Sequence, residues 1–132
     1  MNKYILVVDD EPDAREILDL VLGTLEVDVV EVPDGREALN AILDQIPLVV
    51  ISDLEMPKFD GRYVIQELYN HNIDVPIIIF TSHIITPELA QSLGIPVNRM
   101  FQKGSVSMTE LRRQVMDLIH DEIDVDLSFL QR

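Results

Sequence analysis

The sequence predicts an α/β protein in three layers, in which helices cover both faces of a doubly wound, five-stranded parallel sheet. Three observations lead to this fold class. Apolar runs of four to six residues recur along the chain, as they do in strands that are buried on both faces. Between these runs, apolar residues repeat at helical spacing, and such alternation is typical of parallel sheets. At 132 residues, the chain has the length of a single domain.

Two strand–helix units are predicted in the first third of the chain. Residues 4–8 form the first apolar run, and a helical repeat follows between Pro12 and Gly23, with proline near the start and glycine at the end. A second strand is predicted over residues 27–32. The next helix has an apolar face that carries Ala38, Leu39, Ile42 and Leu43.

Three further units complete the predicted sheet. The remaining strands are expected at residues 48–51, 75–80 and about 99–102. The remaining helices are expected over residues 62–70, from the N-cap Thr86 to Gly94, and from the capping-box sequence that begins at Ser107. With right-handed crossovers, the flavodoxin-like strand order 2-1-3-4-5 accommodates these five units.

The C-terminal segment has a different pattern, because acidic and apolar residues alternate there. We interpret residues 1–121 as one domain and residues 122–132 as an acidic and apolar tail, frayed at its end. A partner-binding segment, an edge strand or the start of an output domain are the alternatives.

The composition excludes several classes of function. The chain has 24 acidic and 10 basic residues and a net charge of −14, so it repels nucleic-acid phosphates and anionic lipids. We therefore expect no direct binding to nucleic acid or to membranes. Cysteine is absent, which excludes thiolate zinc sites and cysteine nucleophiles. No apolar run approaches the ~18 residues of a membrane span and no signal peptide is evident, so we expect a cytoplasmic protein.

Polar residues that can carry chemistry follow the predicted strands. They are Asp9 and Asp10 after the first, Asp53 after the third, Thr81 and Ser82 after the fourth, and Lys103 after the fifth. Each alone fits a helix cap or a solvated loop, but the carboxyl ends of parallel strands share one edge of the sheet. Carboxylates gathered there repel one another unless they share a cation such as Mg²⁺. A carboxylate can then become the nucleophile that forms an aspartyl phosphate, while the hydroxyl and ammonium groups contact phosphate oxygens.

Four motifs stand in this order at the strand ends. They are Val7-Val8-Asp9-Asp10-Glu11-Pro12, Ile51-Ser52-Asp53-Leu54-Glu55-Met56-Pro57 with Asp60-Gly61, Phe80-Thr81-Ser82, and Lys103. With these motifs, residues 3 to about 121 resemble a response-regulator receiver domain of two-component signalling, similar to the chemotaxis regulators.

The resemblance implies a role for each site residue. Asp53 would be the phosphoacceptor. Mg²⁺ or Mn²⁺ would be held by Asp9, Asp10, Asp53 and the backbone carbonyl of Glu55. The phosphoryl group would be contacted by Thr81 and Lys103. The implied donor is a sensor histidine kinase or a histidine phosphotransfer protein, and the output runs through a downstream protein, from a monomer or a phosphorylation-dependent homodimer. The domain would assist its own phosphorylation and dephosphorylation without turning over an external substrate.

The chain departs from the usual receiver pattern at several positions. Gly104 follows the lysine where proline is usual, and Met100 stands where an aromatic switch residue is usual. Glycine can adopt unusual backbone angles, and methionine can replace the aromatic ring in part. Residues that can tune the lifetime of the phosphoryl group are Ser82, His83, Glu55 and Met100.

Two other classes of function compete with this interpretation. A degenerate receiver would act as a phosphorylation-independent interaction module, which the departures at Gly104 and Met100 favour and the complete acidic and lysine set disfavours. A flavin protein would need a phosphate-binding loop after the first strand, where this chain carries Asp9-Asp10-Glu11. An aspartate-based phosphatase would carry its paired acids two residues apart.

Overall fold

The computed structural model describes the backbone of residues 3–130 and the side chains of residues 3–120. One parallel sheet has the order β2-β1-β3-β4-β5, which confirms the predicted fold class and strand order. The strands are β1 (Tyr4–Val8), β2 (Asp28–Val32), β3 (Val49–Ser52), β4 (Ile77–Thr81) and β5 (Met100–Gln102). The α-helices are α1 (Pro12–Leu22), α2 (Gly35–Asp44), α3 (Gly61–Asn70), α4 (Pro87–Leu93) and α5 (Met108–Leu130).

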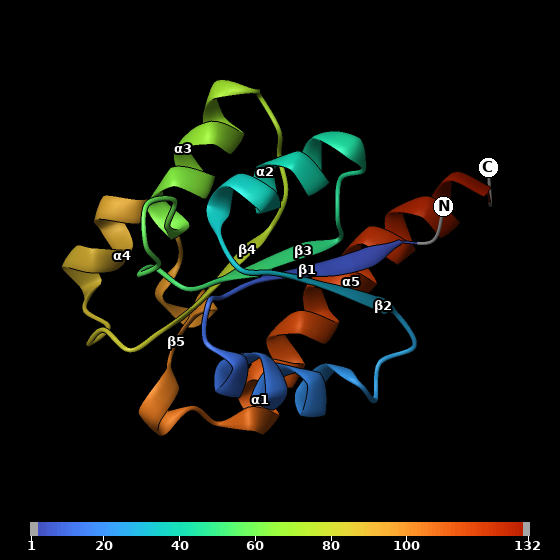
Figure 1. Ribbon diagram of the computed structural model, residues 1–132. Coiled ribbons are helices and arrows are strands. Elements are labelled where there is room, and N and C mark those ends of the chain that lie inside the picture. Colours follow the sequence, from blue (N-terminus) through green and yellow to red (C-terminus); the bar gives the residue numbers. More distant parts are fainter. Residues whose placement is uncertain (1–2, 131–132) are drawn as a thin grey trace.

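Helices cover both faces of the sheet (Figure 1). Helices α1 and α5 pack on one face, and α2, α3 and α4 pack on the other. In β1, Ile5 and Val7 face α1 and α5, whereas Leu6 and Val8 face the α2 side. All four side chains are fully buried, because successive residues of a strand point to opposite faces and both faces are covered. The continuous apolar run of β1 is explained by this two-sided burial.

Two glycines allow helices to approach the carboxyl end of the sheet closely. A Cβ atom at Gly61, the first residue of α3, would collide with the backbone carbonyl of Asp53. A Cβ atom at Gly35 would meet the carbonyl of Phe59 at 2.8 Å, and the Gly35 N–H donates a 2.7 Å hydrogen bond to that same oxygen. The glycines therefore fix α2 and α3 against the loop that follows Asp53.

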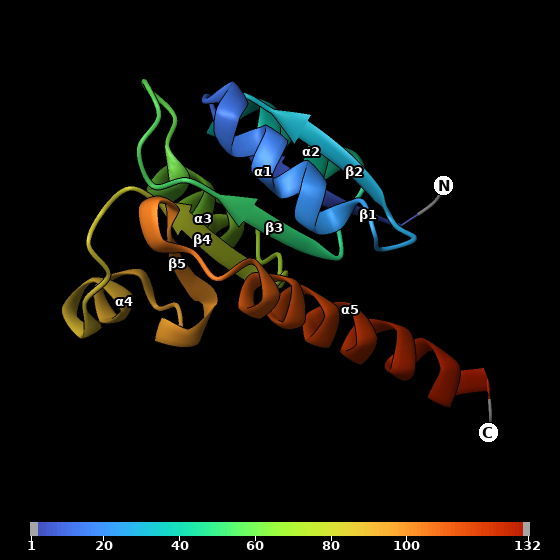
Figure 2. The ribbon, with the colours of Figure 1, turned by 90° about the horizontal axis from the view of Figure 1, so that it is seen from below.

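The predicted N-cap of helix α5, Ser107, is confirmed, but the capping box and the length of the helix differ from the prediction. Ser107 caps it, because the N–H of Glu110 donates to Ser107 Oγ at 3.2 Å, but the Glu110 carboxylate pairs with Arg113. The predicted reciprocal capping box is therefore one-sided. The helix ends at Leu130, and Figure 2 shows α5 as one long helix that extends toward the C-terminus. Its backbone is therefore helical where the sequence suggested a frayed tail or an edge strand. None of the described helices is long and apolar enough to cross a membrane.

The loop between β3 and α3 contains a strained residue. Lys58 has a φ of +72° and is exposed, and a non-glycine residue pays about 1 kcal/mol for this left-handed conformation. We expect Lys58→Gly to raise the free energy of unfolding by about 0.5 kcal/mol, because the relief of strain exceeds the added chain entropy. Urea denaturation measures the change. Lys58→Ala is the control, since alanine keeps the strain, and an equal gain in both variants would contradict this explanation.

Candidate functional site

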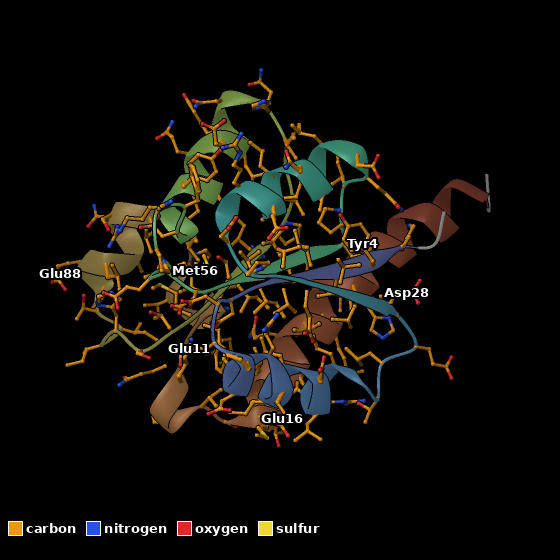
Figure 3. The ribbon with its side chains drawn as sticks, in the orientation of Figure 1. Tyr4, Glu11, Glu16, Asp28, Met56 and Glu88 are labelled. Atoms are coloured by element: carbon orange, nitrogen blue, oxygen red, sulfur yellow. The ribbon has the colours of Figure 1, made fainter. Side chains whose placement is uncertain are left out.

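The register of the sheet brings the predicted residues to one edge. Val8 pairs with Ser52 and Thr81 pairs with Gln102, so the next residue of each strand continues into the same edge. The N–H of Asp53 donates to the carbonyl of Val8 at 3.0 Å, which places it beside Asp9. In Figure 3, the labelled Glu11 and Met56 lie toward this edge, and Tyr4 and Asp28 lie toward the opposite edge.

Lys103 occupies the centre of the site. Its Nζ lies 2.8 Å from Asp53 Oδ2, 2.9 Å from Asp9 Oδ2 and 3.0 Å from Glu11 Oε1. The lysine side chain is 11% exposed. Burial alone would lower its pKa, but the contacts with Asp53, Asp9 and Glu11 outweigh burial and raise the pKa of Lys103 above its ordinary value. The ammonium group therefore stays charged and serves as the counter-ion of the site.

The acidic side chains are close enough to hold a cation together. One carboxylate oxygen each from Asp9, Asp10, Glu11 and Asp53 lies within 4.8 Å of the others. Asp9 is buried, and its Oδ1 accepts the N–H of Glu11 at 2.9 Å. Its Oδ2 lies beside Lys103 as an ion pair, but no donor in the described part of the chain is aligned on it for a hydrogen bond. A buried carboxylate oxygen without a hydrogen bond fits a hard divalent cation.

The pKa of Asp9 reflects mainly the burial of its carboxyl group. Burial raises the pKa of its carboxyl group, and the contacts with Lys103 and with the Glu11 N–H lower it in part. The charge of Asp53 adds to the increase, so the net direction is upward. A cation placed among these carboxylates would offset the cost of burying the Asp9 charge and the smaller repulsion by Asp53, the two causes that raise its pKa.

Asp53 is held in a defined orientation. Its Oδ1 accepts the N–H of Glu55 at 3.2 Å, which leaves Oδ2 for Lys103. The hydroxyl of Ser52 donates to the carbonyl of Asp53 at 2.9 Å. The side chain is only 3% exposed, yet Asp10 and Glu11 beside it are exposed. Hydrogen bonds therefore orient Asp53, the predicted nucleophile, and it can be approached from the exposed side of the site, where Asp10 and Glu11 lie.

Thr81 and the residues after it form the other wall of the site. Thr81 is fully buried, and its Oγ1 accepts the N–H of His83 at 3.2 Å. The hydroxyl proton remains able to donate, because a hydroxyl group can accept and donate at once. Ser82 is exposed.

The side chains of His83 and Glu55 contact each other beside the site. Nε2 of His83 lies 2.7 Å from Oε1 of Glu55, and the side chains are 41% and 68% exposed. The pair joins the loop after β3 to the loop after β4. The sequence placed both residues near the site as separate candidates, and their direct contact comes from the structure.

The two departures near Lys103 have ordinary structural settings. Met100 is buried against the α4 side of the sheet, and Phe101 packs on the α1 and α5 side, as the strand alternation predicts. Gly104 does not have a positive φ, and a Cβ atom there would meet nothing within 4 Å. Gly104 therefore does not adopt the unusual backbone angles that glycine allows.

The prediction from sequence omitted one residue of the site, Glu11. Its carboxylate contacts Lys103 although it belongs to the start of α1, where it is the N-cap residue. Glu11 is the third consecutive acidic residue after the first strand, which could have indicated a role in the site. An exposed acidic residue before a helix is common, however, so the pattern alone does not distinguish it.

Comparison with known proteins decides the family. A sequence model described as "Response regulator receiver domain" matches residues 5–119. The chain belongs to the response-regulator receiver family. The recognition from sequence is confirmed, and with it a place for this receiver domain in two-component signalling.

Relatives and solved structures agree with this assignment. A probable transcriptional regulator ycf27 of Porphyridium aerugineum is 46% identical over 81 residues, which are 61% of this chain and 33% of that protein. The alkaline phosphatase synthesis transcriptional regulatory protein PhoP of Bacillus subtilis (strain 168) is 37% identical over 82 residues, which are 62% and 34% of the two chains. This receiver domain therefore spans about one third of the length of these relatives.

The structural similarity extends over nearly the whole fold. The receiver domain of the Francisella response regulator 1452 superposes with a TM-score of 0.79 at 26% identity, over 92% of this chain and 99% of that chain. The bacteriophytochrome response regulator AtBRR superposes with a TM-score of 0.74 at 29% identity, over 89% and 93% of the chains.

Proposed function

We propose that this receiver domain accepts a phosphoryl group on Asp53 in a reaction that depends on Mg²⁺ or Mn²⁺. The donor would be a phosphohistidine on a sensor histidine kinase or a histidine phosphotransfer protein. One observation carries the proposal: the Oδ2 atoms of Asp53 and Asp9 share the Lys103 ammonium group at 2.8 and 2.9 Å, at the edge where Thr81 also lies.

The residues of the site support an in-line transfer. A carboxylate oxygen of Asp53 would attack phosphorus, the bond between phosphorus and the donor imidazole nitrogen would break, and the leaving imidazole nitrogen would take up a proton from water. Lys103 and the Thr81 hydroxyl would donate to the phosphoryl oxygens. Asp9, Asp10, Asp53 and the Glu55 carbonyl would hold the metal. When bound, a divalent cation neutralises charge on the transferring group.

The consequence of phosphorylation would be a change in protein contacts. A downstream protein would recognise the phosphorylated form of a cytoplasmic domain that acts as a monomer or as a phosphorylation-dependent homodimer. The domain would catalyse only its own phosphorylation and dephosphorylation. The charge of −14 supports a protein as the partner, in place of nucleic acid or a membrane.

Removal of the metal tests the proposal directly. We expect wild-type protein incubated with acetyl phosphate and Mg²⁺ to gain the mass of one phosphoryl group, and we expect no gain when EDTA replaces Mg²⁺. Intact-mass spectrometry gives the result, and slow loss of the adduct identifies a labile acyl phosphate. An unmodified mass under conditions where Mg²⁺ still binds would support the degenerate interaction module.

The pair of His83 and Glu55 is expected to protect the phosphoryl group from water. The two side chains bridge the loops that carry Asp53 and Thr81, so loss of the bridge opens the mouth of the site. We expect His83→Gln and Glu55→Gln each to shorten the lifetime of phosphorylated Asp53 by about threefold, and the double variant to add little, because the two residues act as one unit. Phosphate release after removal of the donor measures the lifetime. His71→Gln is the control, and additive effects would contradict the bridge.

A further inference from the structure

Glu11 contacts the centre of the site, yet the proposed phosphoryl transfer gives it no role. Its Oε1 lies 3.0 Å from Nζ of Lys103. Its side chain is 55% exposed, whereas those of Asp9 and Asp53 are 1% and 3% exposed. Lys103 is therefore held by the buried carboxylates of Asp9 and Asp53 and by the exposed carboxylate of Glu11, which marks the rim of the site.

Lys103 occupies the two carboxylate oxygens of Asp9 and Asp53 that are most open to a divalent cation. Oδ1 of Asp9 already accepts the Glu11 N–H, and Oδ1 of Asp53 already accepts the Glu55 N–H. The Oδ2 atoms are thus free of backbone hydrogen bonds, and both lie within 2.9 Å of the lysine Nζ. Two cations on these atoms would repel strongly, because a buried site screens charge weakly. A divalent cation at Asp9 and Asp53 therefore deprives Lys103 of two of its three anchors.

The third anchor remains in place after this exchange. Glu11 belongs to the acidic group within 4.8 Å, but the proposed metal-binding set leaves its carboxylate to Lys103, and its backbone N–H ties it to Asp9 at 2.9 Å. Its carboxylate stands at the rim, which is the side from which a phosphoryl group reaches Asp53. A lysine without this anchor would extend into solvent and would have to be ordered again for each transfer.

We propose that Glu11 is a positioning residue that keeps Lys103 at the mouth of the site once the metal is bound. This inference rests on the proposed function, because the positioned ammonium group would contact the phosphoryl group on Asp53. Glu11 acts through Lys103 and contacts neither the metal nor the phosphoryl group.

The NMR signal of the Lys103 ammonium group shows whether carboxylates hold it in place. In protein with ¹⁵N-labelled lysine, a buried ammonium group bound to carboxylates gives a slowly exchanging NMR signal, and Lys103→Arg assigns it. We expect the wild-type signal to persist without metal and at saturating Mg²⁺. In Glu11→Gln, we expect the Lys103 signal to be present without metal and to disappear at saturating Mg²⁺. Asp13→Asn removes one charge from the first turn of α1 and is expected to behave as wild type.

The rate of labelling provides a second readout. At saturating Mg²⁺, differences in metal affinity no longer affect the rate of phosphorylation by acetyl phosphate. We expect Glu11→Gln to slow labelling about tenfold, because the lysine is no longer positioned. Asp13→Asn should remain within about twofold of wild type, since an exposed charge outside the site contributes little.

Several NMR outcomes would overturn the inference. They are loss of the signal from wild type on addition of Mg²⁺, its persistence in Glu11→Gln with Mg²⁺, and its absence from metal-free wild type. None of these readings requires phosphorylation. A protein that showed the expected NMR behaviour but accepted no phosphoryl group would contradict the proposed function and leave the anchoring of Lys103 by Glu11 established.

Discussion

Asp53→Asn is expected to abolish phosphorylation by acetyl phosphate while the protein stays folded. The amide group is a far weaker nucleophile than the carboxylate, so we expect labelling to fall at least about a thousandfold. The change in the free energy of unfolding should stay within about 1 kcal/mol. The loss of one contact with Lys103 is offset by relief of the repulsion between Asp53 and Asp9, and Asp9 and Glu11 still hold the lysine.

Intact-mass spectrometry and urea denaturation measure the two parts of this prediction. Asp28→Asn is the control for charge, because Asp28 is exposed at the start of β2, away from the site. It should be labelled like wild type. Labelling of Asp53→Asn at the wild-type rate would place the phosphoacceptor elsewhere and would remove the basis of the proposed reaction.

Lys103→Met is expected to destabilise the metal-free protein by about 3 kcal/mol, because two buried carboxylates and Glu11 lose their common counter-ion. Added Mg²⁺ should stabilise this variant more than it stabilises wild type, since no ammonium group competes for the Oδ2 atoms. Labelling should also slow by at least about a hundredfold through loss of a charge that contacts the phosphoryl oxygens. Urea denaturation in EDTA and in Mg²⁺ measures the stability of both proteins.

The pH dependence of this destabilisation follows from the direction of the pKa shifts. The pKa of Lys103 is raised by its carboxylate contacts, so its stabilising effect is present below its ordinary pKa of 10.5 and is lost only at still higher pH. The pKa of Asp9 is also raised, so its ionised form is the one that burial disfavours. We therefore expect the difference between Lys103→Met and wild type to be full at neutral pH and to shrink in acid as the carboxylates protonate.

Lys58→Met is the matched control for Lys103→Met, because Lys58 is an exposed lysine of the neighbouring loop. It should change stability by less than about 0.5 kcal/mol, with no dependence on Mg²⁺. Equal stability of Lys103→Met and wild type in EDTA would show that the lysine is not the counter-ion of the carboxylates.

Much of the site was predictable because a parallel sheet obeys a simple geometric rule. Residues that follow buried strands meet at one edge, and this rule alone brought together Asp9, Asp53, Thr81 and Lys103. The alternation of apolar runs with helical repeats predicted a doubly wound sheet, for which the order 2-1-3-4-5 is one common solution. The extent of α5 did not follow, because alternating acidic and apolar residues are compatible with several backbone conformations.

The amino-acid sequence therefore predicted the fold class and all of the residues at the functional edge except Glu11. Only the tertiary structure decided how these side chains pair. The contacts of Glu11 with Lys103 and of Glu55 with His83 join residues 92 and 28 positions apart. Such contacts depend on loop conformations and side-chain rotamers that no periodicity encodes. Hydrophobic patterning specifies which elements pack, whereas distances of about 3 Å between charged atoms arise only after the elements have packed.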